Sequence, residues 1–391
     1  MDAAVREFDF PVGYHAFHKS QVFNFQLNRW HSLGYARYED MAEVGSRIAS
    51  FSDWKREMVG MAERATADGR TVNAAFYYRA AEFYTSAEDS DKERLYDRFS
   101  ELFYEAYADD GIQRLQIPYG DSMLPAMRVS PGTKAGKGTI VMHGGFDSFM
   151  EEFYSWMCHF AREGYEVVAF EGPGQGAARR KQGLAFDPAW EKPVGAVLDH
   201  LELEDITLLG ISMGGWLCFR AAAFEPRVER VIASGVAFDY MQIPPAISQW
   251  LFKLFVNHMR GFLVSQAQKK MKKDPMHMWT LGQLMYMTRQ DDIMEAMKAA
   301  QWMNAENLHS EKVTQDVLIL TGKEDHFIPL KMHKMQVRAL VNAQSVVGRV
   351  FTREESAQNH CQIGNVGLAL STMTEWLASH TCQRAGKMPA L

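Results

Sequence analysis

The sequence predicts an α/β fold in which helices flank a mostly parallel sheet, with further helices before the sheet and inserted within it. From residue 139 onward, strand-like apolar runs alternate with helix-like segments, as the connections between parallel strands require. Residues 1–108 are helix-like and show no obvious series of strands. A methionine-rich stretch over 240–312 is also predicted to be helical, and it separates two of the expected strands.

Residues 1–108 are therefore assigned to a helical N-terminal cap domain. Residues 74–84 combine good helix formers with aromatic side chains at helical spacing, and residues 91–107 continue in the same style. We expect these aromatic side chains to pack between helices. A hairpin with strands at 112–118 and 123–129 should then open the sheet.

The α/β core is assigned to residues 109–239 and 313–391. Its first parallel strand, at 139–142, leads to His143-Gly144-Gly145-Phe146. Small residues at this point allow backbone N–H groups to approach a substrate oxygen. His143 itself is interpreted as a residue that shapes the loop.

A glycine-rich loop, Glu171-Gly172-Pro173-Gly174-Gln175-Gly176-Ala177, follows a strand expected at 166–170. It fits the pattern Gly-x-Gly-x-x-Ala, which raises the alternative of a dinucleotide-binding turn. The proline inside the loop argues against that alternative. The basic run Arg179-Arg180-Lys181 is expected at the surface.

The pentapeptide Gly210-Ile211-Ser212-Met213-Gly214 lies between an apolar strand at 206–209 and a helix expected over 215–223. In this context, Gly-x-Ser-x-Gly predicts a nucleophile elbow, because glycines permit the strained turn that exposes the serine. The helix N-terminus behind Ser212 favours nearby negative charge. We therefore expect Ser212 to be the nucleophile, the alternative being a structural turn with an incidental serine.

The acid that orients the base is expected at Asp325, in the loop after a buried strand at 317–322. A carboxylate at the carboxyl end of a strand is suitably placed to hold a histidine. Glu324 is the rival acid, but an adjacent side chain should point elsewhere. His326 is too close in sequence to pair with Asp325, and it is interpreted as a loop or pocket residue.

The general base is expected at His360, in a loop between a strand at 345–351 and a helix at 366–378. Ser212, Asp325 and His360 then follow the chain order nucleophile, acid, histidine. This is the order of α/β-hydrolases, so the predicted fold class becomes the α/β-hydrolase fold.

An oxyanion hole should accompany these three residues. It is expected to comprise the backbone N–H of Met213 and one further N–H from Gly145 or Phe146. Serine-centred chemistry of this kind needs no metal and no organic cofactor, so none is expected. The expected partner is a small-molecule substrate.

Composition argues against several other classes of protein. The 391 residues carry a formal net charge of −6 and no long basic tract, which argues against nucleic acid as a partner. Residues 1–7 lack the apolar core of a signal peptide, and no uninterrupted apolar run reaches membrane-spanning length. The four cysteines show no paired metal spacing. We expect a cytoplasmic protein with reduced thiols and no membrane partner.

Four segments carry a resemblance to a known family, namely 143–148 with Glu151-Glu152, 171–176, 210–215 and 360–362. Together they resemble the α/β-hydrolase family of 2,6-dihydroxypseudooxynicotine hydrolase, the fungal pigment chain-shortening hydrolases and the FrsA-like esterases. The helical N-terminal segment is similar too, so the resemblance covers nearly the whole chain. It implies cleavage of carbon–carbon bonds next to ketones, or of esters, by a homodimer in which the N-terminal helices take part.

In the first subgroup of that family, an additional acid lies beyond the strand after the nucleophile. The nearest match here is Asp239, which follows a strand expected at 230–236. Asp239 is therefore a candidate auxiliary acid. The alternative is a helix N-cap or turn aspartate.

Residues 240–312 are expected to form a helical lid. Flexible methionine side chains suit a lid that contacts irregular apolar ligands, and they equally suit the filling of a core.

The expected function is hydrolysis of an apolar or aromatic ketone or ester in secondary metabolism, including carbon–carbon cleavage of a polyketide-like β-diketone. The alternatives are a carboxylesterase, or an acyltransferase or lactonising enzyme that uses the same triad. A binding protein on a hydrolase scaffold is disfavoured by the complete triad.

Overall fold

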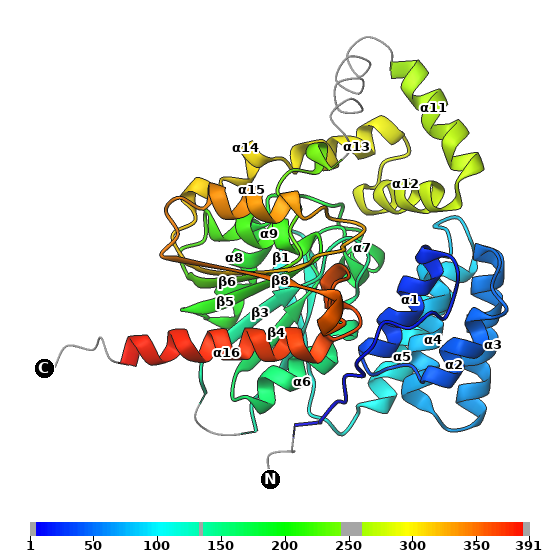
Figure 1. The fold of residues 1–391 in the computed structure, drawn as a ribbon, viewed down its shortest axis with the longest axis horizontal. Helices are drawn as coiled ribbons and strands as arrows, with labels where there is room; N and C mark the ends of the chain where they lie inside the picture. The colour runs from blue at the N-terminus through cyan, green and yellow to red at the C-terminus, as the bar shows by residue number, and fades with distance from the viewer. Residues whose placement is uncertain (1–4, 133–135, 244–259, 386–391) are drawn as a thin grey trace, which may run out of the picture.

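The centre of the molecule is one eight-stranded sheet with the order β1-β2-β4-β3-β5-β6-β7-β8 (Figure 1). A computed structural model describes residues 5–132, 136–243 and 260–385. The β1–β2 and β2–β4 pairs are antiparallel, and the pairs from β4 to β8 are parallel. The strands are Gln113–Tyr119 (β1), Ser122–Val129 (β2), Thr139–His143 (β3), Glu166–Phe170 (β4), Ile206–Ile211 (β5), Val228–Ser234 (β6), Asp316–Gly322 (β7) and Ser345–Phe351 (β8).

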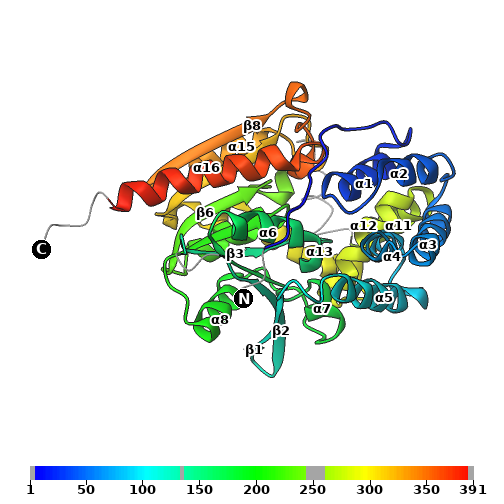
Figure 2. The ribbon, with the colours of Figure 1, turned by 90° about the horizontal axis from the view of Figure 1, so that it is seen from below.

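Helices cover both faces of this sheet, which confirms the predicted fold class (Figures 1 and 2). One face carries α6 (Tyr154–Arg162) and α16 (Val366–Ala385). The other carries α8 (Glu191–Leu201), α9 (Gly214–Ala222) and α15 (Lys331–Ala339). Strands β5 and β7 are buried along their whole length. This explains why they are continuous apolar runs in the sequence.

Between residues 5 and 112, which the structure describes, five helices precede the sheet and pack beside it, at the right of Figures 1 and 2. Their aromatic side chains pack between helices as expected; Phe76 of α4, for example, meets the Phe99 ring of α5 with ring centroids 5.5 Å apart. The helices are Gln21–Ser32 (α1), Tyr38–Gly45 (α2), Phe51–Ala67 (α3), Thr71–Phe83 (α4) and Asp91–Ala106 (α5), the last two at the predicted positions.

The described parts of the predicted insertion, 240–243 and 260–312, contain helices and no strand. Residues 244–259 lie outside the described residues. Trp279 of α12 joins the insertion to the N-terminal helices, because its Nε1 donates to the Phe83 carbonyl of α4 over 2.7 Å. The elements are Tyr240–Gln242 (η2), Arg260–Lys273 (α11), Pro275–Thr288 (α12), Ile293–Trp302 (α13), Ala305–Leu308 (α14) and Ser310–Lys312 (η3).

The loop after β4 is packed against the core and does not form an open phosphate-binding turn. A Cβ on Gly172 would lie 2.3 Å from the Trp190 ring, and one on Gly176 would lie 1.8 Å from a Glu171 carboxylate oxygen. The glycines therefore serve close packing. This disfavours the dinucleotide alternative, although a short helix, α7 (Gly176–Arg180), does follow the loop.

The expected surface position of Arg180 was wrong. Its side chain is 3% exposed and pairs with Glu82 of α4, which also accepts from Lys92 and Arg79. The carboxylates of Glu82 from α4 and Glu93 from α5 make this burial possible. Sequence spacing alone does not reveal them, because the partners lie far along the chain.

Candidate active site

Ser212 lies in a strained turn between β5 and α9. Its φ of +63° is in the left-handed region, which a residue with a side chain rarely adopts. Flanking glycines make the turn possible, because a Cβ on Gly210 would lie 2.0 Å from the Gly214 carbonyl oxygen. The Ser212 N–H donates to the Ser234 carbonyl of β6 over 2.8 Å. The turn thus places the Ser212 hydroxyl at the carboxyl end of the sheet.

A chain of hydrogen bonds joins Ser212 to His360 and Asp325. His360 belongs to η5 (His360–Gln362), and its Nε2 lies 2.8 Å from Ser212 Oγ. Its Nδ1 lies 2.7 Å from Asp325 Oδ2. The other oxygen, Asp325 Oδ1, accepts the backbone N–H groups of Phe327 and Ile328 over 2.8 and 2.9 Å. These backbone bonds fix the orientation of the Asp325 carboxylate, and the carboxylate in turn fixes the orientation of the His360 imidazole.

The surroundings of Asp325 and His360 favour an ion pair between these two side chains. Burial alone would raise the pKa of Asp325, but the adjacent His360 charge and hydrogen bond lower it below its ordinary value. Burial alone would lower the pKa of His360, but the Asp325 carboxylate raises it well above 6.5. His360 is therefore poised to receive a proton.

The loop after β3 approaches the same turn from the other side. A Cβ on Gly145 would lie 2.6 Å from the Met213 backbone nitrogen, so this close approach requires glycine. Gln175 Nε2 donates to the carbonyl oxygens of Gly144 and Gly145 over 2.8 and 3.1 Å. In a trans peptide the N–H points opposite to the carbonyl. The N–H groups of Gly145 and Phe146 therefore point away from Gln175.

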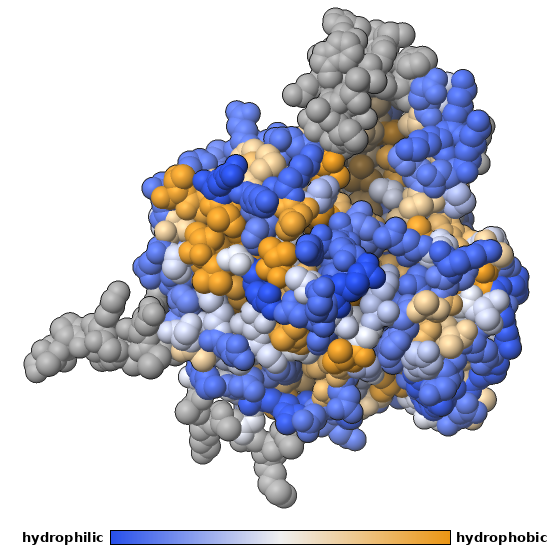
Figure 3. All heavy atoms as spheres, in the orientation of Figure 1, coloured by the Kyte–Doolittle hydropathy of each residue, from blue (hydrophilic) through white to orange (hydrophobic). Residues whose placement is uncertain are grey.

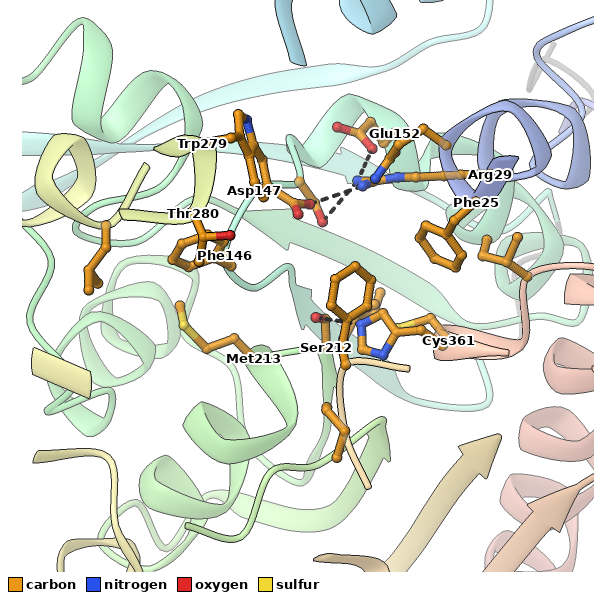
Figure 4. Close-up of a pocket in the computed structure, with 18 of the residues that line it drawn as sticks. Phe25, Arg29, Phe146, Asp147, Glu152, Ser212, Met213, Trp279, Thr280 and Cys361 are labelled. Atoms are coloured by element: carbon orange, nitrogen blue, oxygen red, sulfur yellow. Dashed lines mark hydrogen bonds and ion pairs between the residues drawn. The ribbon is translucent and has the colours of Figure 1, made fainter. Parts of the chain in front are cut away.

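These groups open onto a cavity of about 300 Å³ (Figure 4). Figure 3 shows orange, hydrophobic surface in a recess beside α11. Most of the cavity wall is apolar or aromatic, and both the N-terminal helices and the insertion contribute to it. Representative lining residues are Phe25 of α1, Leu33 just after α1, Phe146, Met213, Met276 and Trp279 of α12, Met303 and Ile328. Such a cavity suits an apolar or aromatic small molecule.

Comparison with known proteins identifies the family. Residues 134–348 match the family described as serine aminopeptidase, S33. The chain belongs to this α/β-hydrolase family. The hydrolase is 31% identical to Hydrolase LUC6 of Fusarium sp over 285 residues, which cover 61% of this chain and 67% of LUC6.

Two further likenesses confirm the resemblance expected from the motifs. The 20-hydroxy-prefusarin hydrolase FUS2 of Gibberella moniliformis is 31% identical over 231 residues, covering 54% of this chain and 53% of FUS2. The crystal structure of 2,6-dihydroxy-pseudo-oxynicotine hydrolase superposes with a TM-score of 0.63 at 22% identity. The superposition covers 90% of this chain and 94% of that one, and it shows a shared fold.

The rival residues of the hydrolase point elsewhere, as expected. Glu324 is exposed and pairs with Arg353. The His326 ring lies 4.8 Å from the Phe25 ring and 4.0 Å from the Phe327 ring. Burial lowers the pKa of His326 to about 4, so this side chain is neutral near pH 7.

Asp239 is a helix N-cap, which is the alternative to the auxiliary acid. Its carboxylate accepts the Met241 N–H and the Gln242 side-chain amide, each over 2.9 Å, and so caps η2. Among the described residues that line the cavity, its neighbour Tyr240 appears and Asp239 does not. The geometry therefore favours the N-cap over an auxiliary acid.

Neither a metal cluster nor a membrane helix is found in the described ranges. There, no group of three or more His, Cys, Asp or Glu side chains is arranged to hold a metal ion. Likewise, none of the helices in those ranges has both the length and the apolar character that crossing a bilayer requires.

Several residues of the site had no role predicted from the sequence, among them Gln175, Gln283 and Arg29. Gln175 sits in the quoted motif 171–176, so its position in the sequence was visible although its contact was not. Gln283 of α12 donates to the Phe146 carbonyl over 3.0 Å. Arg29 of α1 lines the cavity. A single glutamine or arginine on a helix is ordinarily a surface residue, so no pattern marked the last two.

Proposed function

We propose that the protein is a serine-dependent hydrolase in which Ser212 is the nucleophile, His360 the general base and Asp325 the residue that orients it. The observation that carries this proposal is the Ser212–His360–Asp325 hydrogen-bond chain at the edge of an apolar cavity. Membership of an α/β-hydrolase family supports it as well.

In the first step, His360 Nε2 accepts the hydroxyl proton while Ser212 Oγ attacks the substrate carbonyl carbon. The oxygen then carries negative charge. The N–H of Met213 and that of Phe146 or Gly145 donate to this oxyanion, and the N-terminus of α9 adds a favourable field.

In the second step, the tetrahedral intermediate collapses to an acyl-enzyme, and the protonated His360 gives its proton to the leaving group. For an ester the leaving group is an alkoxide. For a β-diketone it is an enolate carbon, so the broken bond is carbon–carbon. Water, activated by His360, then hydrolyses the acyl-enzyme in both cases.

The substrate we propose is an apolar or aromatic ketone or ester, including a polyketide-like β-diketone. The aromatic walls of the cavity support this class, since Phe25, Phe146 and Trp279 all line it. The alternative functions are a carboxylesterase, or an acyltransferase or lactonising enzyme with the same triad.

A product screen by liquid chromatography and mass spectrometry tests the proposal. Wild type and Ser212→Ala are incubated with diketones, aryl ketones and esters, with and without an added alcohol or amine. We expect turnover to fall by about 10⁴-fold or more in Ser212→Ala. Near-wild-type turnover by the variant would exclude Ser212. Products that carry the added nucleophile would identify a transferase.

A further inference from the structure

Among the described residues that line the apolar cavity, Arg29, Asp147 and Glu152 form a charged group that lies across from Ser212 (Figure 4). Arg29 comes from α1, and Asp147 comes from the loop that follows Phe146. The Arg29 guanidinium donates to Asp147 Oδ1 over 3.0 Å. The proposed reaction assigns no role to either residue.

The pair is held in place by a second carboxylate and a second guanidinium. Arg29 donates to Glu152 Oε2 over 2.5 Å, and Arg79 donates to Glu152 Oε1 over 2.8 Å and to the Asp147 carbonyl over 2.5 Å. Burial lowers the pKa of Arg29, but Glu152 and Asp147 outweigh burial and raise it above its ordinary value. Arg29 is therefore always charged, and Glu152 has both oxygens occupied.

Asp147 differs from Glu152 in that it keeps accepting capacity toward the cavity. Its side chain is 26% exposed, whereas that of Glu152 is fully buried. Within the described residues, its side chain accepts one hydrogen bond, on Oδ1. A carboxylate has about four acceptor sites, so Oδ2 can receive a donor from a bound molecule.

Gln26, one turn before Arg29 on α1, carries a second side-chain acceptor. Gln26 also lines the cavity and is 3% exposed. Its Oε1 is buried and has no hydrogen-bond partner among the described residues. Because this atom is enclosed by protein, Gln26 contributes to the cavity wall, and Asp147 supplies the accessible acceptor.

We propose that Asp147, fixed by Arg29, forms a subsite that binds the hydroxyl group of an aromatic substrate. The free Oδ2 of Asp147 accepts the single proton of that hydroxyl, whereas a substrate carboxylate would meet the Asp147 charge. The aromatic wall, with Phe25 and Trp279, accommodates the ring that carries the hydroxyl. The proposal rests on the proposed function, since it assumes that the scissile carbonyl lies at Ser212.

Pairs of esters that differ only in the aromatic hydroxyl group test whether the subsite binds that group. The probes are p-nitrophenyl ω-(4-hydroxyphenyl)alkanoates with about two to six methylenes and the corresponding ω-phenylalkanoates. At the best chain length, wild type should prefer the hydroxylated ester by about tenfold or more in kcat/KM. Asp147→Asn should reduce this ratio several-fold. The control Asp121→Asn changes an exposed turn residue and should leave the ratio as in wild type.

Equal kcat/KM for the two esters at every length in wild type would overturn the subsite, whatever the variants do. So would a ratio that Asp147→Asn leaves unchanged.

Binding of unreactive ketones to Ser212→Ala tests the subsite separately from the proposed function. Calorimetry compares 4-(4-hydroxyphenyl)butan-2-one with 4-phenylbutan-2-one, neither of which needs to react. Tighter binding of the hydroxylated ketone, by about tenfold, supports the subsite even if wild type hydrolyses no ester. Hydrolysis by Ser212 together with equal affinity for both ketones would reject the subsite and keep the nucleophile.

Discussion

His360 lies between a carboxylate and a hydroxyl, and its charge state should control the pH dependence of activity. It must be neutral to accept the Ser212 proton, and its pKa is raised above 6.5 by Asp325 against the effect of burial. We therefore expect kcat/KM for an uncharged ester to rise with pH, with a midpoint above 6.5.

Asp325→Asn should move that midpoint to lower pH, because burial then lowers the His360 pKa without an opposing charge. Turnover should also fall by about 10⁴-fold. Profiles of kcat/KM against pH for both proteins test this, and a midpoint that does not move would contradict the assignment of Asp325.

Gln175 is expected to act through the oxyanion loop, without touching the substrate. Gln175→Glu is nearly isosteric and keeps the acceptor for the Gly172 N–H, which Gln175 Oε1 receives over 3.1 Å. It loses the two donations that orient the Gly144 and Gly145 carbonyls. We expect kcat to fall by about 10²-fold while KM changes by less than about threefold.

Steady-state kinetics on one ester provide the measurement, with Gln182→Glu, an exposed residue nearby, as the matched control. A variant that raises KM and spares kcat would show that Gln175 serves substrate binding instead.

At the scale of elements, α12 links the N-terminal helices to the cavity. Trp279 donates to the Phe83 carbonyl, stacks on the Phe83 ring at 4.9 Å and meets the Phe146 ring at 6.0 Å. Trp279→Ala should raise KM for a long aromatic ester by about tenfold, or about 1.4 kcal/mol. Trp279→Phe keeps a ring and should recover most of that loss; equal KM values in all three proteins would show that α12 does not bind the substrate.

Elements defined by local patterns were predictable. The alternation at 206–223 and the buried run at 317–322 gave β5, α9 and β7 almost to the residue, because each depends on its own apolar periodicity and glycines. The strand expected at 230–236 is two residues out of place, since β6 runs over Val228–Ser234. Gly235, at φ +84°, turns the chain after it.

Contacts between distant elements were not predictable. The sequence marks Ser212, Asp325 and His360 through order and loop position, and these three meet in space. It does not show that Arg29 reaches Asp147, because that contact depends on how α1 docks against the sheet. The roles of polar residues such as Gln175 and Arg29 follow from packing geometry, which local periodicity does not encode.

For the whole molecule, we propose that residues 1–108 form a cap domain and 240–312 a lid on a core of 109–239 and 313–391. Buried ion pairs cross the first boundary, since Arg79 of α4 pairs with Glu152. A protein that starts near residue 109 would leave such groups unpaired and expose apolar surface.

We therefore expect the truncated protein to aggregate or lose activity, and the full chain to form a homodimer. Light scattering, dye binding and ester hydrolysis measure these outcomes together. A truncated protein that is soluble, monomeric and fully active would contradict the proposed cap.

The cavity wall combines residues from opposite ends of the chain, from Phe25 on α1 to Ile363 after β8. A ribosome makes the first of these long before the last, so α1–α5 emerge before the sheet that covers their apolar faces exists. Nascent chains should therefore depend on chaperones at these helices. They also lack His360 until late in synthesis, and no ester or ketone in the cell meets an activated serine before the fold around it is complete.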